Sequence, residues 1–329
     1  MVNGKQQTLV IHVDDMLITA ESENAIDNII KEIGEKYENL SIYRGRKLDY
    51  LGMTFDFTES QKVKITMNGY IQDLLLYCQD MEGTAKTPAA NDLFDIDENS
   101  EQLDEKKRQN FHSIVAKLLY LSKRVRPDLL TAISFLSKRV KSATVQDMKK
   151  LQRVIRYLRG TSTLGIILQA NNYVCIYAYV DASYGVHSNL RSQTGCIIGL
   201  GCGPVYCKST AQKINTKSST EAELVSLSDM TGQVIWTRNF LLGQGYKVPP
   251  ATIYQDNMST IALVRNGKSN NSRTRHIAIR YFFVADKVKN GEVAIEYLPT
   301  GHMIADILTK PLQGEQFVKL RNQLLNWNE

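Results

Sequence analysis

The chain has 329 residues, of which 43% are hydrophobic and 22% are charged, and its formal net charge is +6. This length exceeds one ordinary hydrophobic core and predicts two or more domains. The composition is that of a soluble globular protein, and no apolar run approaches the roughly 18 residues that a membrane helix needs.

The N-terminus and the cysteines indicate in which cellular compartment the protein is expected. The first apolar stretch, residues 9–13, is too short for a signal peptide. The five cysteines are an odd number without zinc-ligand spacing, so we expect reduced thiols in an intracellular protein. The mild basic excess fits a nucleic-acid ligand without proving one.

The first predicted element is a hairpin over residues 8–19, where two apolar runs flank Asp14 and Asp15. A bare pair of acids is most simply a solvated turn. Two like charges between buried strands, however, repel each other unless a cation lies between them. Both interpretations therefore stay open for this pair.

The next stretch mixes helices, a strand and a loop. A helix is predicted over 23–37 with Ser22 as its cap, a strand over 48–57, and a helix followed by a loop over 66–90. Residues 92–105 contain seven acids and no Lys or Arg, which predicts a mobile surface loop.

Three basic helices follow, from Phe111 to near Pro127, over about 128–140 and over 145–159. Between Lys117 and Arg159, 12 Lys or Arg oppose two acids. Such a block can contact a phosphate backbone, and a solvated helix face is the alternative. The residues that we assign to nucleic-acid contact are Lys149, Lys150, Arg153, Arg156 and Arg159.

The remaining residues alternate between short strands and helices. The strands are predicted at 173–180, 192–200, 203–208, 251–256 and 292–298, and the helices at 220–242, 258–266, 277–289 and within 303–325. This order predicts an α/β layer fold with a mixed five-stranded sheet and flanking helices.

Four acids stand at the ends of these elements. Asp181 closes the first strand, Glu223 opens the long helix, Asp256 ends the fourth strand, and Asp306 lies early in a terminal helix. Acids on four such elements can converge at one edge of a sheet. Rigid carboxylates that still reach solvent are what divalent metal ions need.

Each acid also has an ordinary explanation. Asp256 is compatible with an Asx turn, Asp306 with a surface helix, and Glu223 with a capping box that begins at Thr220. Glu221 is the rival of Glu223, but we expect it to point roughly 160–200° away around the helix and to face solvent.

Four sequence motifs together resemble the ribonuclease H domain of copia-type retrotransposon Pol polyproteins. They are Tyr-Val-Asp-Ala-Ser at 179–183, Ser-Ser-Thr-Glu-Ala-Glu-Leu at 218–224, Gln-Asp-Asn at 255–257 and Ala-Asp-Ile-Leu-Thr-Lys-Pro-Leu at 305–312. The family acid stands directly before a Leu or similar residue in the helix, which selects Glu223. The residues around Asp14 resemble the reverse-transcriptase palm of the same elements, with His12 in place of the usual Tyr.

The resemblance implies three regions. Residues 1–65 would be a partial reverse-transcriptase palm without the fingers and the first catalytic strand, 66–172 a helical, basic thumb and connection, and 173–329 a ribonuclease H-like domain. Residues 48–57 resemble the hairpin that guides the primer end, with a plain hairpin as the alternative. Because the Asp of an earlier palm strand is missing, we expect that this chain alone does not polymerise.

The implied activity is hydrolysis of the RNA strand of an RNA–DNA hybrid. Two Mg²⁺ ions about 4 Å apart, with Mn²⁺ as a substitute, would be bound by the four nuclease acids. Asp14 and Asp15 would be polymerase metal ligands, and His302 would aid proton transfer or product release. The residues with implied catalytic or metal-binding roles in the nuclease are Asp181, Glu223, Asp256, Asp306 and His302.

The implied partners are the hybrid, tRNA-primed or template RNA, cDNA and the rest of the Pol polyprotein, without a membrane. The implied location is the cytoplasm, in virus-like particles, and the nucleus. Around His276, relatives carry Asp and His where this chain has Ala278 and Phe282, which suggests divergence. Two alternatives remain: a non-catalytic nucleic-acid-binding relic, and a polymerase subunit that borrows the missing strand from another chain.

Overall fold

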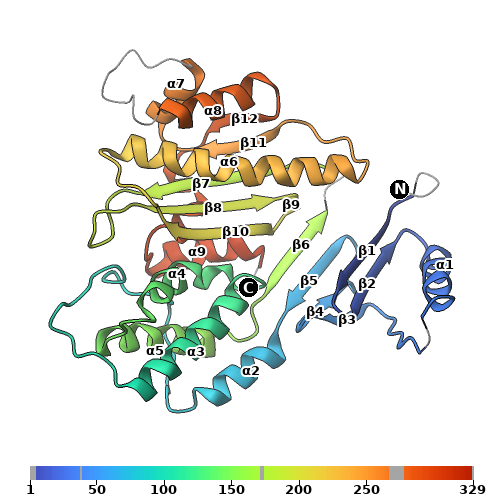
Figure 1. Cartoon of the computed structure of the whole chain (residues 1–329), viewed down its shortest axis with the longest axis horizontal. Coiled ribbons are helices and arrows are strands. Elements are labelled where there is room, and N and C mark those ends of the chain that lie inside the picture. The colour runs from blue at the N-terminus through green and yellow to red at the C-terminus, as the bar shows by residue number, and fades with distance from the viewer. Residues whose placement is uncertain (1–4, 38, 171–173, 267–277, 328–329) are drawn as a thin grey trace.

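The computed structural model describes residues 5–37, 39–170, 174–266 and 278–327. They form an α/β fold with one mixed sheet, two antiparallel sheets and helices around them (Figure 1). All five cysteines are free. Within these residues, no helix is both long and apolar enough to cross a membrane.

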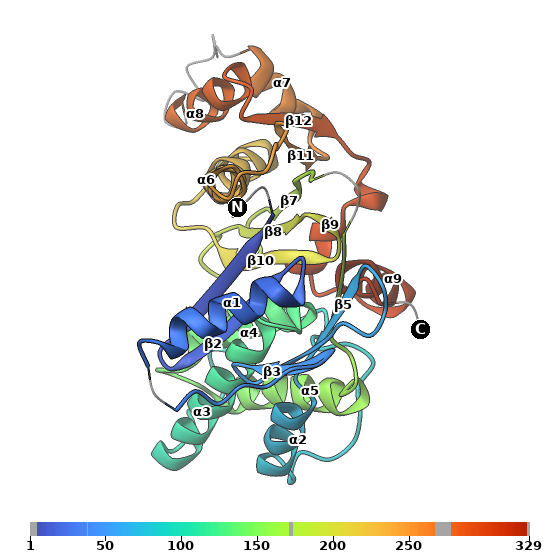
Figure 2. The same cartoon turned by 90° about the vertical axis from the view of Figure 1, so that its right-hand side faces the viewer.

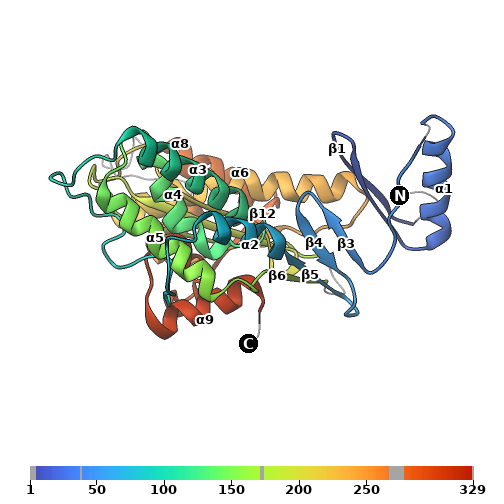
Figure 3. The same cartoon turned by 90° about the horizontal axis from the view of Figure 1, so that it is seen from below.

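The predicted N-terminal hairpin is confirmed. Strand β1 (Gln7–His12) pairs antiparallel with β2 (Asp15–Ala20), and α1 (Glu23–Gly34) follows. Ile11 is 60% exposed and Val13, at the turn, is 82% exposed, which fits the solvated turn better than a pair of acids between buried strands. Figures 1 and 3 show the hairpin and α1 together at one end of the molecule.

A second antiparallel sheet joins distant parts of the chain. Residues 48–57, predicted as one strand, form two, with a turn at Leu51 and Gly52, which both have positive φ. The sheet runs in the order β3 (Lys47–Tyr50), β4 (Met53–Asp56), β5 (Lys62–Thr66), β6 (Ile166–Ala170) and β9 (Gly201–Cys202). Its hydrogen bonds therefore cross both of the proposed domain boundaries, and the division of the chain into domains stays a prediction.

The helices of the next region, called the helical block, agree closely with those predicted from the sequence. The block contains α2 (Asn68–Tyr77), α3 (Glu105–Ser122), the short 3-10 helix η1 (Pro127–Leu129), α4 (Leu130–Arg139) and α5 (Val145–Gly160). The acidic segment before α3 differs from the predicted surface loop. Leu93 and Phe94 are buried, and the Phe94 ring lies 5.9 Å from that of Phe135, because these two apolar residues anchor the segment despite its acids.

The main sheet is mixed and five-stranded, as predicted. Its order is β10 (Pro204–Ala211), β8 (Gln193–Gly199), β7 (Tyr177–Ser183), β11 (Ala251–Gln255) and β12 (Val293–Tyr297). β8 pairs antiparallel with β7 and β10, whereas β7, β11 and β12 are parallel. The carboxyl ends of β7 and β11 consequently meet at one edge.

Helices cover both faces of this sheet. Figure 2 shows α6 on one side and the C-terminal segment on the other. The strand period of two sends Val180 and Ile198 into the core under α6, and Ile197 into a core shared with the helical block. The remaining elements are α6 (Ser219–Gly243), α7 (Met258–Asn266), α8 (Ala278–Lys289), η3 (Thr300–His302), η4 (Ile304–Leu308) and α9 (Gly314–Leu325).

A buried ion pair stabilises the helical block. Arg126 and Asp128 are both completely inaccessible, and two hydrogen bonds of 2.9 and 2.8 Å join guanidinium and carboxylate. Arg126 also donates to Thr161, through its backbone carbonyl and its hydroxyl, each at 2.8 Å, and Tyr157 donates to Asp128 at 2.7 Å. Every charged group is thus paired, which is the condition for burying charge.

Asp128→Asn is expected to destabilise the fold by about 3 kcal/mol, because it leaves the Arg126 charge buried without a counterion. Lys62→Gln, which removes the exposed partner of Glu59, should cost less than about 1 kcal/mol. Urea unfolding measures both. Equal effects of the two substitutions would contradict the structural role of the buried pair.

Candidate functional site

Asp181 is fixed within β7, between two hydrogen-bonded neighbouring strands. Its backbone carbonyl also accepts a hydrogen bond from Ser226 Oγ at 2.9 Å. The sequence predicted a carboxylate that reaches solvent, but the side chain is only 2% exposed. It is buried because Thr309 Oγ1 donates to its Oδ2 and Lys310 Nζ lies 3.8 Å from the same oxygen.

Asp256 lies beside Asp181 because their strands are parallel. The register pairs Tyr254 with Tyr179, and each acid follows two residues later on its own chain segment. Thr300 Oγ1 donates to Asp256 Oδ2 at 2.8 Å and orients the carboxylate. The ordinary alternative, an acid that only completes a turn, does not explain this position next to a second acid.

Glu223 reaches the same place from α6. The N-cap is Ser218, whose Oγ accepts from the backbone N–H of Glu221 at 3.2 Å, so the predicted capping box at Thr220 is wrong. Glu223 is therefore not needed as a cap. It is 5% exposed, and its Oε2 accepts from Gln255 Nε2 at 3.2 Å.

The expectation that Glu221 faces solvent is also wrong. Glu221 is buried, and its Oε2 accepts from the backbone N–H of Lys217 at 2.8 Å. The helix begins at Ser219, directly after its N-cap Ser218, so its first turn folds Glu221 back onto the preceding loop. Glu221 therefore supports the helix start and lies apart from the carboxylate group around Asp181.

Asp181, Glu223 and Asp256 form a candidate metal site. One carboxylate oxygen from each lies within 4.8 Å of those from the other two. Burial, and then the charges of Asp181 and Asp256, raise the pKa of Glu223 well above its usual value. Hard oxygen donors that repel one another at this spacing fit a divalent cation such as Mg²⁺.

Asp306 adjoins this group from the opposite face of the sheet. It lies in the 3-10 helix η4, not in the predicted α-helix. Burial and the charge of Asp181 raise its pKa to about 6, and Lys310 Nζ donates to its Oδ1 at 2.7 Å. Although burial opposes it, the charges of Asp181 and Asp306 raise the pKa of Lys310.

The close approach of η4 depends on Gly195. This residue pairs with Asp181 on the neighbouring strand. A Cβ at this position would lie 2.7 Å from Thr309 Cγ2 and 2.9 Å from Ala305 O and Leu308 Cβ. The absence of a side chain therefore lets η4 deliver Asp306 to the sheet.

The structure places the other predicted site residues elsewhere. His302 is exposed at the end of η3, two residues after the Thr300 that contacts Asp256. Asp14 and Asp15 are exposed at the hairpin turn and belong to no group of described residues that could hold a metal. The roles of these three residues stay predictions, and His276 lies outside the described residues.

Most of the predicted nucleic-acid contacts on α5 hold a loop of the protein. Lys150 donates to the carbonyls of Leu93 and Asp95, and Arg153 to Thr87 Oγ1. Arg156 donates to the carbonyl of Glu82, and Arg159 to those of Cys78 and Met81. These cations fix segment 78–95 on the helix, and Lys149 is left exposed.

Sequence reasoning missed Thr309, Lys310 and Gln255. Lys310 follows Asp306 by four residues, the spacing of an ion pair on a helix, and this signal was available. The contact of Gln255 with Glu223 joins a strand end to a helix start, and no local pattern predicts it.

Comparisons with known proteins support the resemblance inferred from the motifs. The chain is 30% identical to the Retrovirus-related Pol polyprotein from transposon RE1 of Arabidopsis thaliana, over 96% of this chain and 21% of the relative. The polyprotein from transposon RE2 of the same plant is also 30% identical, over 94% and 21%. That from transposon TNT 1-94 of Nicotiana tabacum is 24% identical, over 94% and 24%.

The similarity to copia-type retrotransposon Pol polyproteins is therefore confirmed. The chain spans about a fifth of the length of the curated relatives it matches. No protein-family model matches it.

Two solved ribonuclease H1 structures align with part of this chain. LC11-RNase H1 from compost is 16% identical, over 41% of this chain and 92% of its own, with a TM-score of 0.31. RNase H1 from Halobacterium salinarum is 15% identical, over 41% and 93%, with a TM-score of 0.29. Scores this low do not establish a shared fold.

Glu223→Gln is expected to be more stable than the unaltered chain at pH 7.5 in EDTA, by about 1 kcal/mol or more. The folded-state pKa of Glu223 is raised, so the stability it contributes is complete below about pH 4.3 and is lost as the pH rises. The advantage of Gln should therefore shrink toward pH 5. Urea unfolding at both pH values measures it.

Magnesium should reverse this order, because it stabilises the unaltered site more than the Gln variant. Asp73→Asn, on the exposed face of α2, is the matched control. It should change neither the stability in EDTA nor the stabilisation by Mg²⁺. A Gln variant that is less stable in EDTA and responds equally to Mg²⁺ would contradict the site.

Lys310→Gln is expected to cost about 2 kcal/mol in EDTA above pH 6, because Asp181 and Asp306 lose their shared ammonium group. The cost should fall as the pH drops toward 6, because loss of Lys310 raises the pKa of Asp306 further and the variant takes up the proton first. Mg²⁺ should raise the melting temperature of this variant more than that of the unaltered chain. Lys319→Gln on α9, an exposed lysine, is the control, and equal Mg²⁺ responses would refute the counterion role.

Proposed function

We propose that this chain, a relative of copia-type retrotransposon Pol polyproteins, hydrolyses the RNA strand of RNA–DNA hybrids at the carboxylate site. The observation that carries the proposal is the meeting of Asp181, Glu223 and Asp256 within 4.8 Å at one edge of a mixed sheet. Asp306 lies beside them. A fold of the ribonuclease H type would place four acids in this order along the chain.

The residues fit divalent cations in charge and chemistry. Asp181, Glu223 and Asp256 would hold one ion, and Asp181 with Asp306 would contribute to a second. When bound, Mg²⁺, or Mn²⁺ in its place, supplies an activated water at neutral pH and stabilises the leaving oxygen of a phosphodiester. The raised pKa of Glu223, caused by burial and by the charges of Asp181 and Asp256, fits a carboxylate that a bound cation would stabilise in its charged form.

Residues of the chain prepare this site before any ligand arrives. Gln255 holds one oxygen of Glu223, and Thr300 holds one oxygen of Asp256. Lys310 neutralises part of the charge of Asp306 and Asp181. This orientation by fixed donors lowers the cost of reorganisation during reaction. His302, exposed close to Thr300, is proposed to aid proton transfer or product release.

The proposed enzyme would select its substrate by the sugar and backbone of the hybrid and not by the identity of the bases. Contacts to 2′-hydroxyl groups across the wide minor groove would distinguish RNA from DNA, so sequence preference should be weak. The proposed partners are the hybrid, tRNA-primed or template RNA, cDNA and the remaining Pol polyprotein. The proposed locations are cytoplasmic virus-like particles and the nucleus.

For the polymerase region we propose a structural assignment without an activity. Residues 1–65 are proposed to be a partial palm, 66–172 a thumb and connection, and 173–329 the nuclease domain. Asp14 and Asp15 sit on a hairpin turn, as polymerase acids would, but their strands are exposed. We propose that the residues of this chain alone do not support polymerisation.

Metal-dependent cleavage of the RNA strand of a labelled hybrid is the expected activity. Asp181→Asn should lower the rate by on the order of 10³-fold, about 4 kcal/mol of transition-state stabilisation. The matched control, Asp73→Asn, should cleave normally. Gel analysis of both end-labelled strands measures the reaction.

Cleavage that persists in folded Asp181→Asn would refute the assignment of this residue. Hybrid binding without cleavage by the unaltered chain would instead support the non-catalytic binding relic. DNA synthesis on an RNA template only after addition of a longer Pol fragment would support the polymerase subunit that borrows its missing strand from another chain.

A further inference from the structure

A groove between the helical block and the main sheet is lined by four basic side chains. It lies between the ends of α3 and α4 on one side and the edge strand β10 on the other, with a volume of about 490 Å³. Lys123, Arg124 and Lys138 come from the helical wall, and Lys208 from the strand. None of its described lining residues is Asp or Glu.

These cations lack carboxylate partners among the described residues, although Arg124 lies over the Tyr120 ring and donates to the Tyr120 backbone carbonyl at 3.4 Å. Arg126 and Arg139 of the same block are paired with Asp128 and Asp147, whereas no described carboxylate pairs with any of the four groove cations. Loss of water around Lys138, and the nearby Arg191, lower its pKa to about 8. The groove thus concentrates like charges without a counterion.

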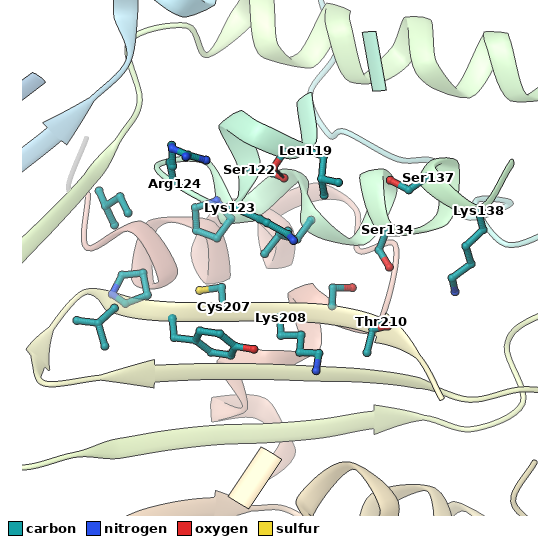
Figure 4. A pocket seen from close by; sticks show the side chains of 17 residues that line it. Leu119, Ser122, Lys123, Arg124, Ser134, Ser137, Lys138, Cys207, Lys208 and Thr210 are labelled. Carbon is teal, nitrogen blue, oxygen red and sulfur yellow. Dashed lines mark hydrogen bonds between the residues drawn. The ribbon is translucent and has the colours of Figure 1, made fainter. Parts of the chain in front are cut away.

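The preference of basic residues for helix ends explains only part of this cluster of cations. Basic residues favour helix C-termini, and Lys123, Arg124 and Lys138 lie at or near the ends of α3 and α4. This preference does not account for Lys208, because Lys208 lies in the middle of β10. Figure 4 shows Lys123 and Lys138 extending from the helices toward the strand that carries Lys208.

The groove is open along the strand and also offers hydroxyl groups. Ser134 and Thr210 lie between the basic side chains, one on each wall (Figure 4). Cations spread over both walls suit an extended anion with regularly repeated charges better than one small ion. Phosphodiester backbones have this form, and lysine, arginine and hydroxyl donors are their usual contacts.

The register of the sheet connects the groove to the carboxylates. Ser209, next to Lys208, pairs with Gly195, and Gly195 pairs with Asp181. Two strand spacings separate the two positions, roughly 10 Å across the sheet. A duplex with a phosphate at Asp181 must extend over the neighbouring surface in both directions, so its backbone can reach the groove.

We propose that the groove between α3, α4 and β10 is a second nucleic-acid contact, which binds the phosphodiester backbone of the hybrid beside the cleavage site. The identity of the polymer rests on the proposed function, whereas the anion site rests on the groove itself. Most of the α5 cations hold a loop, whereas the groove cations have no carboxylate partner among the described residues, so we expect the groove to supply backbone contacts beside any made by α5.

The test compares two triple variants that lose the same charge. Lys123→Gln/Lys138→Gln/Lys208→Gln removes groove cations, and Lys31→Gln/Lys36→Gln/Lys289→Gln removes exposed lysines of α1, the segment that follows it and α8. Fluorescence anisotropy of a labelled RNA–DNA hybrid in EDTA gives Kd over a range of salt concentrations. EDTA prevents cleavage, so binding is read separately from catalysis.

The groove variant should bind up to about eightfold more weakly per lost contact at 0.1 M salt, and its slope of log Kd against log salt should fall by about 0.9 per contact. The control variant should match the unaltered chain. Equal binding by both variants would overturn the proposal. So would unchanged hybrid binding together with a lost affinity for poly-glutamate, which would assign the groove to an acidic protein.

The two proposals fail separately. If the unaltered chain does not cleave hybrids in Mg²⁺ but the groove variant still loses affinity, the nuclease is refuted and the groove stands. If the chain cleaves hybrids and the groove variant binds as tightly as the control, only the groove is refuted.

Discussion

The mutual repulsion of buried carboxylates is the constraint around which this structure is arranged. Asp181, Glu223 and Asp256 come within 4.8 Å although burial and the charges of Asp181 and Asp256 oppose the ionisation of Glu223. Such an arrangement persists only when surrounding structure fixes each acid independently. Parallel pairing of β7 with β11, the first turn of α6, and the packing of η4 over Gly195 each do so.

The helical block contributes to that framework. Its core is continuous with η4 and α9, so Leu308 and Phe317 pack in the same cluster as Phe111 and Leu136. Thr131 Oγ1 of α4 donates to the carbonyl of Ile307 at 2.7 Å, one residue after Asp306. Through this contact the helices hold the segment that carries the fourth acid, in addition to any contact with nucleic acid.

The sequence predicted what depends on local pattern and missed what depends on distant contacts. Strand ends and the helix start located the acids, because the period-two and helical patterns around them are strong. Burial of Asp181 under Lys310, the pairing of β6 with β9, and the anchoring of the acidic segment by Phe94 join residues far apart in sequence. Composition likewise cannot show that Lys150, Arg156 and Arg159 of α5 donate to backbone carbonyls of segment 78–95.

The central claim is that the acids at the ends of β7 and β11 bind a divalent cation. An anomalous difference map from crystals grown with Mn²⁺ tests it most directly. The account predicts a peak within coordination distance of oxygens from Asp181, Glu223 and Asp256, with the side chains of Gln255 and Thr300 still holding their carboxylates. A map at millimolar Mn²⁺ without density at these three acids would contradict it.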